Sequence, residues 1–240
     1  MSNTYFQFKQ FTIHQDQCSM KVCTDACLFG AYLADWFHEN GKVAEQTAID
    51  IGTGTGLLSL MLAQKTQLCI EALEIDPAAA KQATENFLAS PWKDRLTLFQ
   101  GDALDYPTEK KYGLIFSNPP FFEADLRSPD SGKNAAKHDT GLTLEQLAGL
   151  VDRWLAPDGN FAVLLPYHRV DPFIKIAAGV DLHLQKLTLV KHTKAHPFFR
   201  GMLVLGRKKQ AAEKTEMVIK EAQVYSTHFT ELLQDYYLHL

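Results

Sequence analysis

Residues 48–64 read AIDIGTGTGLLSLMLAQ, and this stretch indicates the fold class. Four mainly apolar residues, Ala48–Ile51, have the length and composition of a buried strand. Glycines then alternate with threonines in a short loop, and Leu57–Gln64 has the apolar content of a helix. A strand, a glycine-rich turn and a helix in this order form the unit with which doubly wound α/β folds bind ligands.

The alternation of strands and helices continues along the chain. Further strands are predicted at Cys69–Ile75, Leu96–Phe99, Leu114–Ser117 and Phe161–Leu165, and helices at Pro77–Leu88, Leu144–Leu155 and Asp171–Ala178. Two late strands, Leu182–Val190 and Met202–Gly206, have no helix between them and predict a closing antiparallel hairpin. Because strands that alternate with helices form parallel sheets covered on both faces, we predict an α/β fold with a mostly parallel seven-stranded sheet.

Two extensions flank this core. Residues 1–46 precede the first strand and contain a predicted helix at Thr24–Phe37. Residues 210–240 follow the hairpin and contain a short strand-like run near Val218 and a predicted helix near Thr230–Tyr237. Since neither extension has the content of a second core, we expect a single domain over residues 1–240.

The composition is that of an ordinary globular protein, with 240 residues of which 46% are hydrophobic and 22% charged. The most apolar run, Phe161–Leu165, is too short to span a bilayer, and Met1–Lys9 lacks the regions of a secretory signal. The four cysteines form no paired C-x-x-C knuckle and no histidine pair completes a zinc set, so we expect no metal. A cytoplasmic monomer with reduced thiols and no membrane partner is the simplest interpretation.

The glycine loop at residues 50–56 admits three interpretations. A dinucleotide site favours G-x-G-x-x-G, but the third glycine here comes early, and Asp50 would repel a phosphate. The same carboxylate can accept a hydrogen bond from an ammonium group, which favours a cofactor with an amino-acid end and no phosphate. A glycine-rich turn without a ligand is the third possibility.

Acidic residues follow the next two strands. Glu74 ends the second predicted strand, where a carboxylate can accept hydrogen bonds from both hydroxyls of a ribose. Asp102, with Ala103 beside it, follows the third strand and can accept a hydrogen bond from an adenine amino group. Three successive strand ends therefore carry groups suited to a nucleoside that bears an amino acid.

Residues 117–122 read Ser-Asn-Pro-Pro-Phe-Phe after the fourth predicted strand. The two prolines fix their own φ angles and hold Asn118 and Pro119 extended. One interpretation is a rigid connection without a chemical role. The other is a set of fixed hydrogen-bond acceptors for a substrate.

The chemistry of an adenine amino group explains the second interpretation. Its nitrogen is a poor nucleophile because the lone pair is delocalised into the ring. The side-chain carbonyl of Asn118 and the backbone carbonyl of Pro119 can accept its two hydrogens and favour a localised lone pair. Phe121 can stack on the base, a contact worth about 1–3 kcal/mol. If the methyl donor is a sulfonium, most of the remaining rate enhancement comes from orienting the nitrogen in line with its methyl group. The predicted catalytic residues are Asn118, Pro119, Pro120 and Phe121.

Together these motifs resemble those of the class I amino-methyltransferases, which have a glycine loop like Asp50–Gly56 and a tetrapeptide like Asn118–Phe121. The segment Lys21–Ala31, KVCTDACLFGA, is similar to the N-terminal motif of the bacterial tRNA1(Val) adenine-N6 methyltransferases. The likeness covers nearly the whole chain, including the stretch His196–Gly206. It implies a Rossmann-like class I methyltransferase fold, S-adenosyl-L-methionine as cofactor, and the adenosine beside the anticodon of a tRNA as substrate.

The resemblance also implies roles for single residues. Lys21, Thr24 and Asp25 would lie near the methionine end of the cofactor. The other implied cofactor-binding residues are Asp50, Gly52, Thr53, Gly54, Gly56, Glu74, Asp102, Ala103 and Asn118. The segment from Asn118 to Phe121 would hold the target base.

Positive charge gathers in two segments, although the net charge of −4 argues against a strongly basic nucleic-acid binder. Such segments can follow the phosphates around one extruded base, and an anticodon-loop adenosine is already unpaired, so that unstacking it costs less than flipping it from a duplex. We therefore expect the tRNA to contact residues after the catalytic loop and in the late hairpin. These substrate-binding residues are Phe122, Lys133, Lys137, His138, His196 and Arg200.

Other functions remain open from the sequence. A protein glutamine N5-methyltransferase uses a similar loop, but with tyrosine in place of Phe121 and after a long N-terminal helical domain. A DNA or ribosomal RNA amino-methyltransferase is a further alternative, although no separate nucleic-acid-reading domain is visible. A module that binds the cofactor without catalysis is disfavoured by the intact Asn118.

Overall fold

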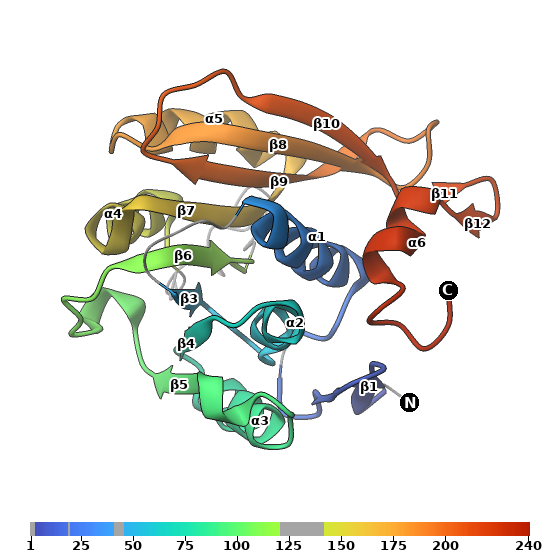
Figure 1. Cartoon of the computed structure of the whole chain (residues 1–240), viewed down its shortest axis with the longest axis horizontal. Coiled ribbons are helices and arrows are strands. Elements are labelled where there is room, and N and C mark those ends of the chain that lie inside the picture. The colour runs from blue at the N-terminus through green and yellow to red at the C-terminus, as the bar shows by residue number, and fades with distance from the viewer. Residues whose placement is uncertain (1–2, 19, 41–45, 121–141) are drawn as a thin grey trace, which may run out of the picture.

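The computed structural model describes residues 3–18, 20–40, 46–120 and 142–240. Eight strands of these segments form one sheet, in the order β10-β8-β9-β7-β6-β3-β4-β5 (Figure 1). Their bounds are β3 (Thr47–Ile51), β4 (Cys69–Glu74), β5 (Leu96–Gln100), β6 (Tyr112–Ser117), β7 (Leu155–Pro166), β8 (His183–Lys191), β9 (Phe198–Gly206) and β10 (Glu213–Val218). Strand β9 runs antiparallel to both of its neighbours, β7 and β8, and the other pairs are parallel. The α/β fold class and the antiparallel closing hairpin are confirmed.

The sheet has one strand more than the seven predicted. The additional strand, β10, comes from the C-terminal extension and pairs in parallel with β8, from Glu213 opposite Lys186 to Val218 opposite Lys191. Its sequence, EKTEMV, has a single fully buried side chain, that of Met217. The apolar pattern of an interior strand is absent because β10 lies at the edge of the sheet.

Helices cover both faces of the sheet (Figure 1). One layer contains α1 (Thr24–Asn40), α2 (Leu57–Lys65), α3 (Pro77–Leu88) and α6 (Thr227–Leu233), and the other contains α4 (Leu144–Trp154) and α5 (Tyr167–Ala178). Alternate residues of β6 serve the two cores, since Leu114 and Phe116 pack with the first layer and Ile115 packs with the second. A strand buried on both faces must be apolar throughout, which is why the central strands read as continuous apolar runs.

Short elements complete the chain. They are β1 (Tyr5–Gln7), β2 (Thr12–His14), β11 (Lys220–Glu221), β12 (Val224–Tyr225) and two 3-10 turns, η1 (Lys93–Arg95) and η2 (Ala103–Asp105). The two ends of the described chain pack against the layer of α1 and α2. The Tyr236 hydroxyl donates to the Met61 carbonyl in α2 at 3.0 Å, and the Lys9 N–H donates to the Tyr236 carbonyl at 2.8 Å. In the described ranges, no helix is long and apolar enough to cross a membrane.

Several predicted boundaries were wrong: β9 begins at Phe198 and not at Met202, α6 is Thr227–Leu233 and not near Thr230–Tyr237, and β7 and α5 begin earlier than predicted. Strand β7 begins at Leu155, directly after α4, because Gly159 lets it approach β6 closely. A Cβ on Gly159 would lie only 2.8 Å from the Tyr112 carbonyl oxygen. Helix α5 begins at Tyr167 and carries Pro172 inside it, whereas the prediction started the helix at Asp171. Tertiary packing outweighs local propensity at the starts of β7 and α5.

The edge of the sheet at which the parallel strands end brings together the predicted cofactor-binding, catalytic and RNA-binding segments. The carboxyl ends of β3, β4, β6 and β7 meet there, as in any parallel sheet. Strand β9 runs the other way, so its amino end lies at the same edge, with Arg200 opposite Pro166. The glycine loop, Asn118 and Arg200 are thereby brought to one side of the molecule.

Candidate active site

The glycine loop connects the end of β3 to the start of α2. The N–H groups of Gly52 and Thr53 both donate to the Leu73 carbonyl in β4, at 2.9 and 3.0 Å. Gly52 and Gly54 have φ angles of 75° and 58°, and a Cβ on either would meet no atom within 4 Å. The loop therefore presents bare backbone to open space, as the close approach of a ligand requires.

Asp50 precedes this loop and is fully buried. Its Oδ2 accepts hydrogen bonds from the hydroxyls of Thr53 and Ser59, both at 2.7 Å. Within the described part of the chain, its Oδ1 has no hydrogen-bond partner. Burial raises the pKa of Asp50 to about 6, against the lowering effect of the two hydroxyls, and the charge of Glu74 adds to the rise. A buried carboxylate oxygen without a partner needs a donor, and a ligand ammonium group could supply one.

Glu74 ends β4 and reaches the glycine loop from the neighbouring strand. Its Oε2 accepts the N–H of Gly54 at 2.8 Å, and its Oε1 accepts the N–H of Asp76 at 2.9 Å. These two bonds hold the carboxylate in place, and each oxygen keeps a lone pair that can accept a hydroxyl. The structure thus brings Glu74 against the open face of the loop, in a geometry suited to a ribose.

Asp102 follows β5, one strand further along the edge. The N–H of Gly101 donates to the Glu74 carbonyl at 2.9 Å, which places the turn after β5 against the end of β4. Asp102 Oδ1 accepts the N–H of Leu104 at 2.9 Å, so this carboxylate caps η2, and Ala103 beside it is half-buried. The predicted acid therefore has a local structural role as well as access to the edge.

Two aliphatic residues in these same turns were not among the predicted site residues. The side chains of Ile75 and Leu104 are 50% and 39% exposed, unlike most aliphatic residues of the sheet. Each directly follows a segment that carries a predicted cofactor acid, Glu74 or Asp102. The sequence signal for Ile75 and Leu104 is an apolar residue close to a strand-end acid, because an exposed apolar side chain there offers a surface on which a heterocyclic base can pack.

Asn118 leaves the sheet next to the glycine loop. The Ser117 hydroxyl donates to the Ile51 carbonyl at 2.7 Å, a buried bond that ties the end of β6 to the end of β3. Asn118 is half-buried, Pro119 is buried and Pro120 is exposed. The predicted catalytic loop and the predicted cofactor loop therefore start from adjacent, directly linked strand ends.

Several predicted residues cannot be placed in this site. Phe121, Phe122, Lys133, Lys137 and His138 lie outside the described residues. Lys21 is exposed, and its Nζ donates to the Asn3 carbonyl at 3.2 Å. Among the described residues, no group of three or more histidine, cysteine or acidic side chains is arranged to hold a metal ion.

An ion pair joins α1 to β9 at the same edge. Arg200 Nε donates to Asp25 Oδ2 at 2.8 Å, and both side chains are largely shielded from solvent. Burial raises the pKa of Asp25, but hydrogen bonds from Cys23 and Arg200 outweigh this effect and hold the pKa below its usual 3.8. Asp25, which is predicted to lie beside the cofactor, thus contacts Arg200, which is predicted to bind RNA.

A pocket of about 460 Å³, which we call the rim pocket, lies beside this ion pair. Its lining includes Thr24 of α1, His192 and Phe199 of the β8–β9 hairpin, Lys220 of β11 and Tyr225 of β12. His196, predicted to bind substrate, lies in the turn of the same hairpin, with its Nδ1 2.7 Å from the Thr193 hydroxyl.

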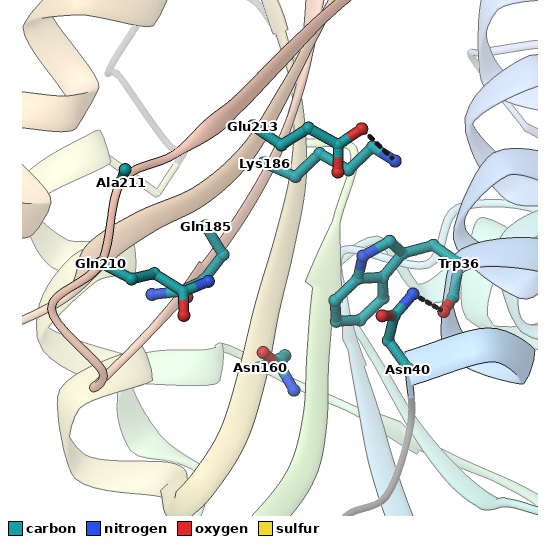
Figure 2. Close-up of a pocket in the computed structure, with 8 residues that line it drawn as sticks. All are labelled: Trp36, Asn40, Asn160, Gln185, Lys186, Gln210, Ala211 and Glu213. Carbon is teal, nitrogen blue, oxygen red and sulfur yellow. Dashed lines mark hydrogen bonds and ion pairs between the residues drawn. The ribbon is translucent and has the colours of Figure 1, made fainter.

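A second pocket, of about 230 Å³, opens at the opposite edge, where β8 and β10 begin (Figure 2). Its lining includes the indole of Trp36 and the amides of Asn40 and Asn160. Its two charged side chains pair with each other, Lys186 Nζ lying 3.1 Å from Glu213 Oε1. None of the predicted site residues that the structure describes lines this pocket.

Comparison with known proteins identifies the family. Residues 30–137 match the family model described as methyltransferase small domain. The chain is 42% identical over 246 residues to the tRNA1(Val) (adenine(37)-N6)-methyltransferase of Dyadobacter fermentans, with 98% of each chain covered. Proteins of the same name from Bacteroides thetaiotaomicron and Pectobacterium carotovorum are 40% and 38% identical, and the alignments cover 100% and 97% of this chain and 100% and 93% of those relatives.

Solved structures show the same fold. A predicted O-methyltransferase from Agrobacterium tumefaciens has a TM-score of 0.63 at 13% identity, with 88% of this chain and 95% of that chain covered. The glycopeptide N-methyltransferase MtfA in complex with S-adenosylmethionine has a TM-score of 0.54 at 14% identity, with 75% and 94% covered. These structures confirm the Rossmann-like methyltransferase fold that the resemblance implied. Because the curated relatives align over almost the full length at about 40% identity, this chain belongs to the family of tRNA1(Val) (adenine(37)-N6)-methyltransferases.

Proposed function

We propose that this protein transfers a methyl group from S-adenosyl-L-methionine to the exocyclic N6 of an adenosine in tRNA, and that this adenosine is the one at position 37 of tRNA1(Val) named for its relatives. The observation that carries the chemistry is the link between the two loops. Asn118 and the glycine loop leave adjacent strand ends that the Ser117–Ile51 hydrogen bond joins. The full-length similarity to the relatives supports the choice of RNA.

The residues present fit the proposed cofactor. An amino-acid end requires acceptors for an ammonium group, and Asp50 has a fully buried oxygen without a partner in the described chain. A ribose requires a fixed carboxylate, and Glu74 is held by two backbone N–H groups. Exposed Ile75 and half-buried Ala103 lie in the turns that would flank a purine. S-Adenosylmethionine supplies, when bound, a methyl group activated by an adjacent sulfonium.

Asn118 and Pro119 orient the target amino group. The side-chain carbonyl of Asn118 and the backbone carbonyl of Pro119 each accept one hydrogen, which favours a localised lone pair on nitrogen. The stiff Asn-Pro-Pro backbone fixes both acceptors before the substrate arrives, so little ordering is left to the reaction itself. The nitrogen releases a proton to water after it has been methylated, so no side chain is required as a strong base.

The proposal also includes the cellular location, the oligomeric state and the residues that contact the RNA. We infer a cytoplasmic monomer that acts on tRNA and requires no metal. Arg200 and His196, at the amino end of β9 and in the turn before it, are on the methyl-transfer edge and would approach the RNA there.

The proposal is tested on tRNA from cells that lack the gene. Incubation with labelled cofactor and digestion to nucleosides should yield label in N6-methyladenosine, and only from tRNA1(Val). Label in another nucleoside would contradict the adenine assignment, and label spread over all tRNAs would contradict the single substrate.

The variant Asn118→Ala tests the acceptor pair. It should bind the cofactor with unchanged affinity but lose turnover by at least about 100-fold, in the range for removing one preorganised hydrogen-bonding group. Asn160→Ala, at the opposite edge of the sheet, is the matched control and should retain full turnover. Normal turnover of Asn118→Ala would refute the mechanism.

A further inference from the structure

The rim pocket lies at the same edge of the sheet as the loop proposed to hold the target base, and its lining residue Phe199 precedes Arg200 in β9. Ser117 pairs with Val163 of β7, and Pro166, three residues later, pairs with Arg200 of β9. With strands about 4.8 Å apart and a rise of about 3.3 Å per residue, the Arg200 backbone lies roughly 14 Å from the end of β6. A single-stranded RNA covers that distance within a few nucleotides.

Aromatic rings form two walls of the rim pocket. His192 and Phe199 stack with their centroids 4.0 Å apart and their planes at 8°. Tyr225 stacks on buried Phe229 of α6, with centroids 4.6 Å apart and planes at 17°. Each ring is therefore already ordered by a neighbour, so a flat ligand that stacks on it loses little side-chain entropy.

Hydrogen bonds and an ion pair hold these walls together. The Lys220 N–H donates to the His192 carbonyl at 2.8 Å, which extends the β8–β10 pairing into β11. Lys194 Nζ, in the β8–β9 turn, lies 2.8 Å from Glu221 Oε1 in β11. The two aromatic walls thus belong to one connected frame.

The charged groups of the rim pocket favour an anionic ligand. Lys220 Nζ lies 5.4 Å from the centroid of the Tyr225 ring, and it forms no ion pair with any described carboxylate. The acid that lines the pocket, Asp25, is matched by Arg200, whose guanidinium lies 5.5 Å from the Phe199 ring centroid. Among the described residues, Lys220 is therefore a cation beside the aromatic walls that has no carboxylate partner.

Ordered rings, a lysine with no carboxylate partner in the described part of the chain, and a volume of about 460 Å³ are features with which proteins hold the bases and phosphates of single-stranded nucleic acid. We propose that the rim pocket is a second base-binding site, which receives a nucleotide flanking the target adenosine in the same tRNA. The base stacks on the His192–Phe199 and Tyr225 walls, and Lys220 contacts its phosphate. The inference rests on the proposed function and adds to it a determinant of substrate recognition.

A double-mutant cycle between protein and RNA tests this site. The RNA is a tRNA1(Val) transcript, either intact or with one abasic nucleotide at the first or second position 5′ or 3′ of the target, or in the D loop as control. The protein variants are Tyr225→Leu, His192→Ala and Lys220→Gln. Lys214→Gln, at the far end of β10, is the matched control for the loss of one exposed lysine.

On intact RNA, Tyr225→Leu and His192→Ala should raise KM between about 5- and 100-fold, the range that stacking on one base covers. Turnover at saturation and cofactor affinity should match the wild type. One flanking abasic substitution should raise the wild-type KM similarly and add nothing in these variants. Lys220→Gln should lower the slope of log KM against log salt by about one, whereas Lys214→Gln should leave it unchanged.

Three results would overturn the inference. KM values like that of Lys214→Gln would show that the pocket does not contact the RNA. Losses additive with every abasic substitution would show that it holds no flanking base, and weaker cofactor binding would assign it to the cofactor. His192 is exposed, so its variant keeps the test valid if Tyr225→Leu does not fold. If wild-type protein does not methylate adenine in tRNA at all, the proposed function fails first, and this inference fails with it.

Discussion

Replacing Asp50 by asparagine should make the protein more stable at neutral pH and weaken cofactor binding at least about tenfold. Asp50 is fully buried, and its Oδ2 accepts hydrogen bonds from the hydroxyls of Thr53 and Ser59. Asparagine has the same shape and an oxygen that can accept from these hydroxyls, but it carries no charge. The substitution therefore removes the cost of burying a carboxylate while keeping the local packing.

The size of the effect follows from the pKa of Asp50, which burial raises from 3.8 to about 6. Below pH 4 the carboxyl is protonated in both folded and unfolded chains, so it does not change the free energy of unfolding. Between pH 4 and 6 the unfolded chain releases the proton and the folded one retains it, so stability falls as the pH rises. Above pH 6 the full cost is present, and at about 1.4 kcal/mol per pKa unit it amounts to roughly 3 kcal/mol.

The assay is urea unfolding of wild type and Asp50→Asn between pH 3.5 and 8. The two proteins should have similar stability near the acid limit, and the variant should be more stable by up to roughly 3 kcal/mol above pH 7. Calorimetric titration at pH 7.5 should show that the variant has lost at least about tenfold in affinity for S-adenosylmethionine, because a charged partner for the ammonium group is gone. Asp105→Asn, an exposed carboxylate in η2, is the control for charge removal and should change neither quantity.

A raised pKa of Asp50 is refuted if the difference in stability between variant and wild type does not depend on pH, or if the variant is less stable at pH 8. Either result would show that Asp50 is stabilised by interactions other than those present in the structure. The expected stability curve with an unchanged cofactor affinity would support the raised pKa of Asp50 but would show that Asp50 does not bind the cofactor.

Three other substitutions test further parts of the site. Gly56→Ala should lower the free energy of unfolding by about 2–4 kcal/mol in a urea melt, because the new Cβ would lie 2.5 Å from a ring carbon of Phe87 at a φ of 82°. Glu74→Gln should raise the cofactor Kd by about tenfold or more in calorimetry, because an amide lacks the charge and one of the acceptors of the carboxylate. Arg200→Ala should cost about 1–2 kcal/mol at pH 7, because it leaves Asp25 half-buried without its cation. Because the pKa of Asp25 is lowered in the fold, this loss should be present above pH 4 and shrink as the pH falls through the folded pKa.

Each of these has a simple control or contrary result. Gly52→Ala places a Cβ in open space at a positive φ and should cost less than Gly56→Ala, so equal losses would exclude the clash as the cause. For Glu74→Gln, an unchanged Kd would remove the residue from the cofactor site. For Arg200→Ala, a loss that stays constant down to pH 2.5 would show that the Asp25 charge is not involved.

Much of the fold was predictable because a strand that is buried on both faces has a continuous apolar run in its own sequence. The central strands β3, β4 and β6 are buried on both faces, so their apolar runs identify them without knowledge of their neighbours. Pro77 and the preceding Asp76 also mark the start of α3, where the Asp76 side chain accepts the N–H groups of Ala78 and Ala79 at 2.8 Å. Edge strand β10 showed only a short strand-like run near Val218 and was not assigned to the sheet, since one buried residue in six does not set a pattern.

The sequence by itself determined the local chemistry: a glycine loop after β3, an acid at the next strand ends and a stiff Asn-Pro-Pro segment after β6. These features depend on neighbours in the chain, and parallel pairing brings strand ends together whatever the order of the strands. Only the tertiary structure decided that Asp25 contacts Arg200, 175 residues away, and that β12 faces the β8–β9 hairpin across the rim pocket. Both depend on β9 entering between β7 and β8 in the reverse direction. Hydrophobic pattern records that a strand is buried, but not which strand lies beside it or which way it runs.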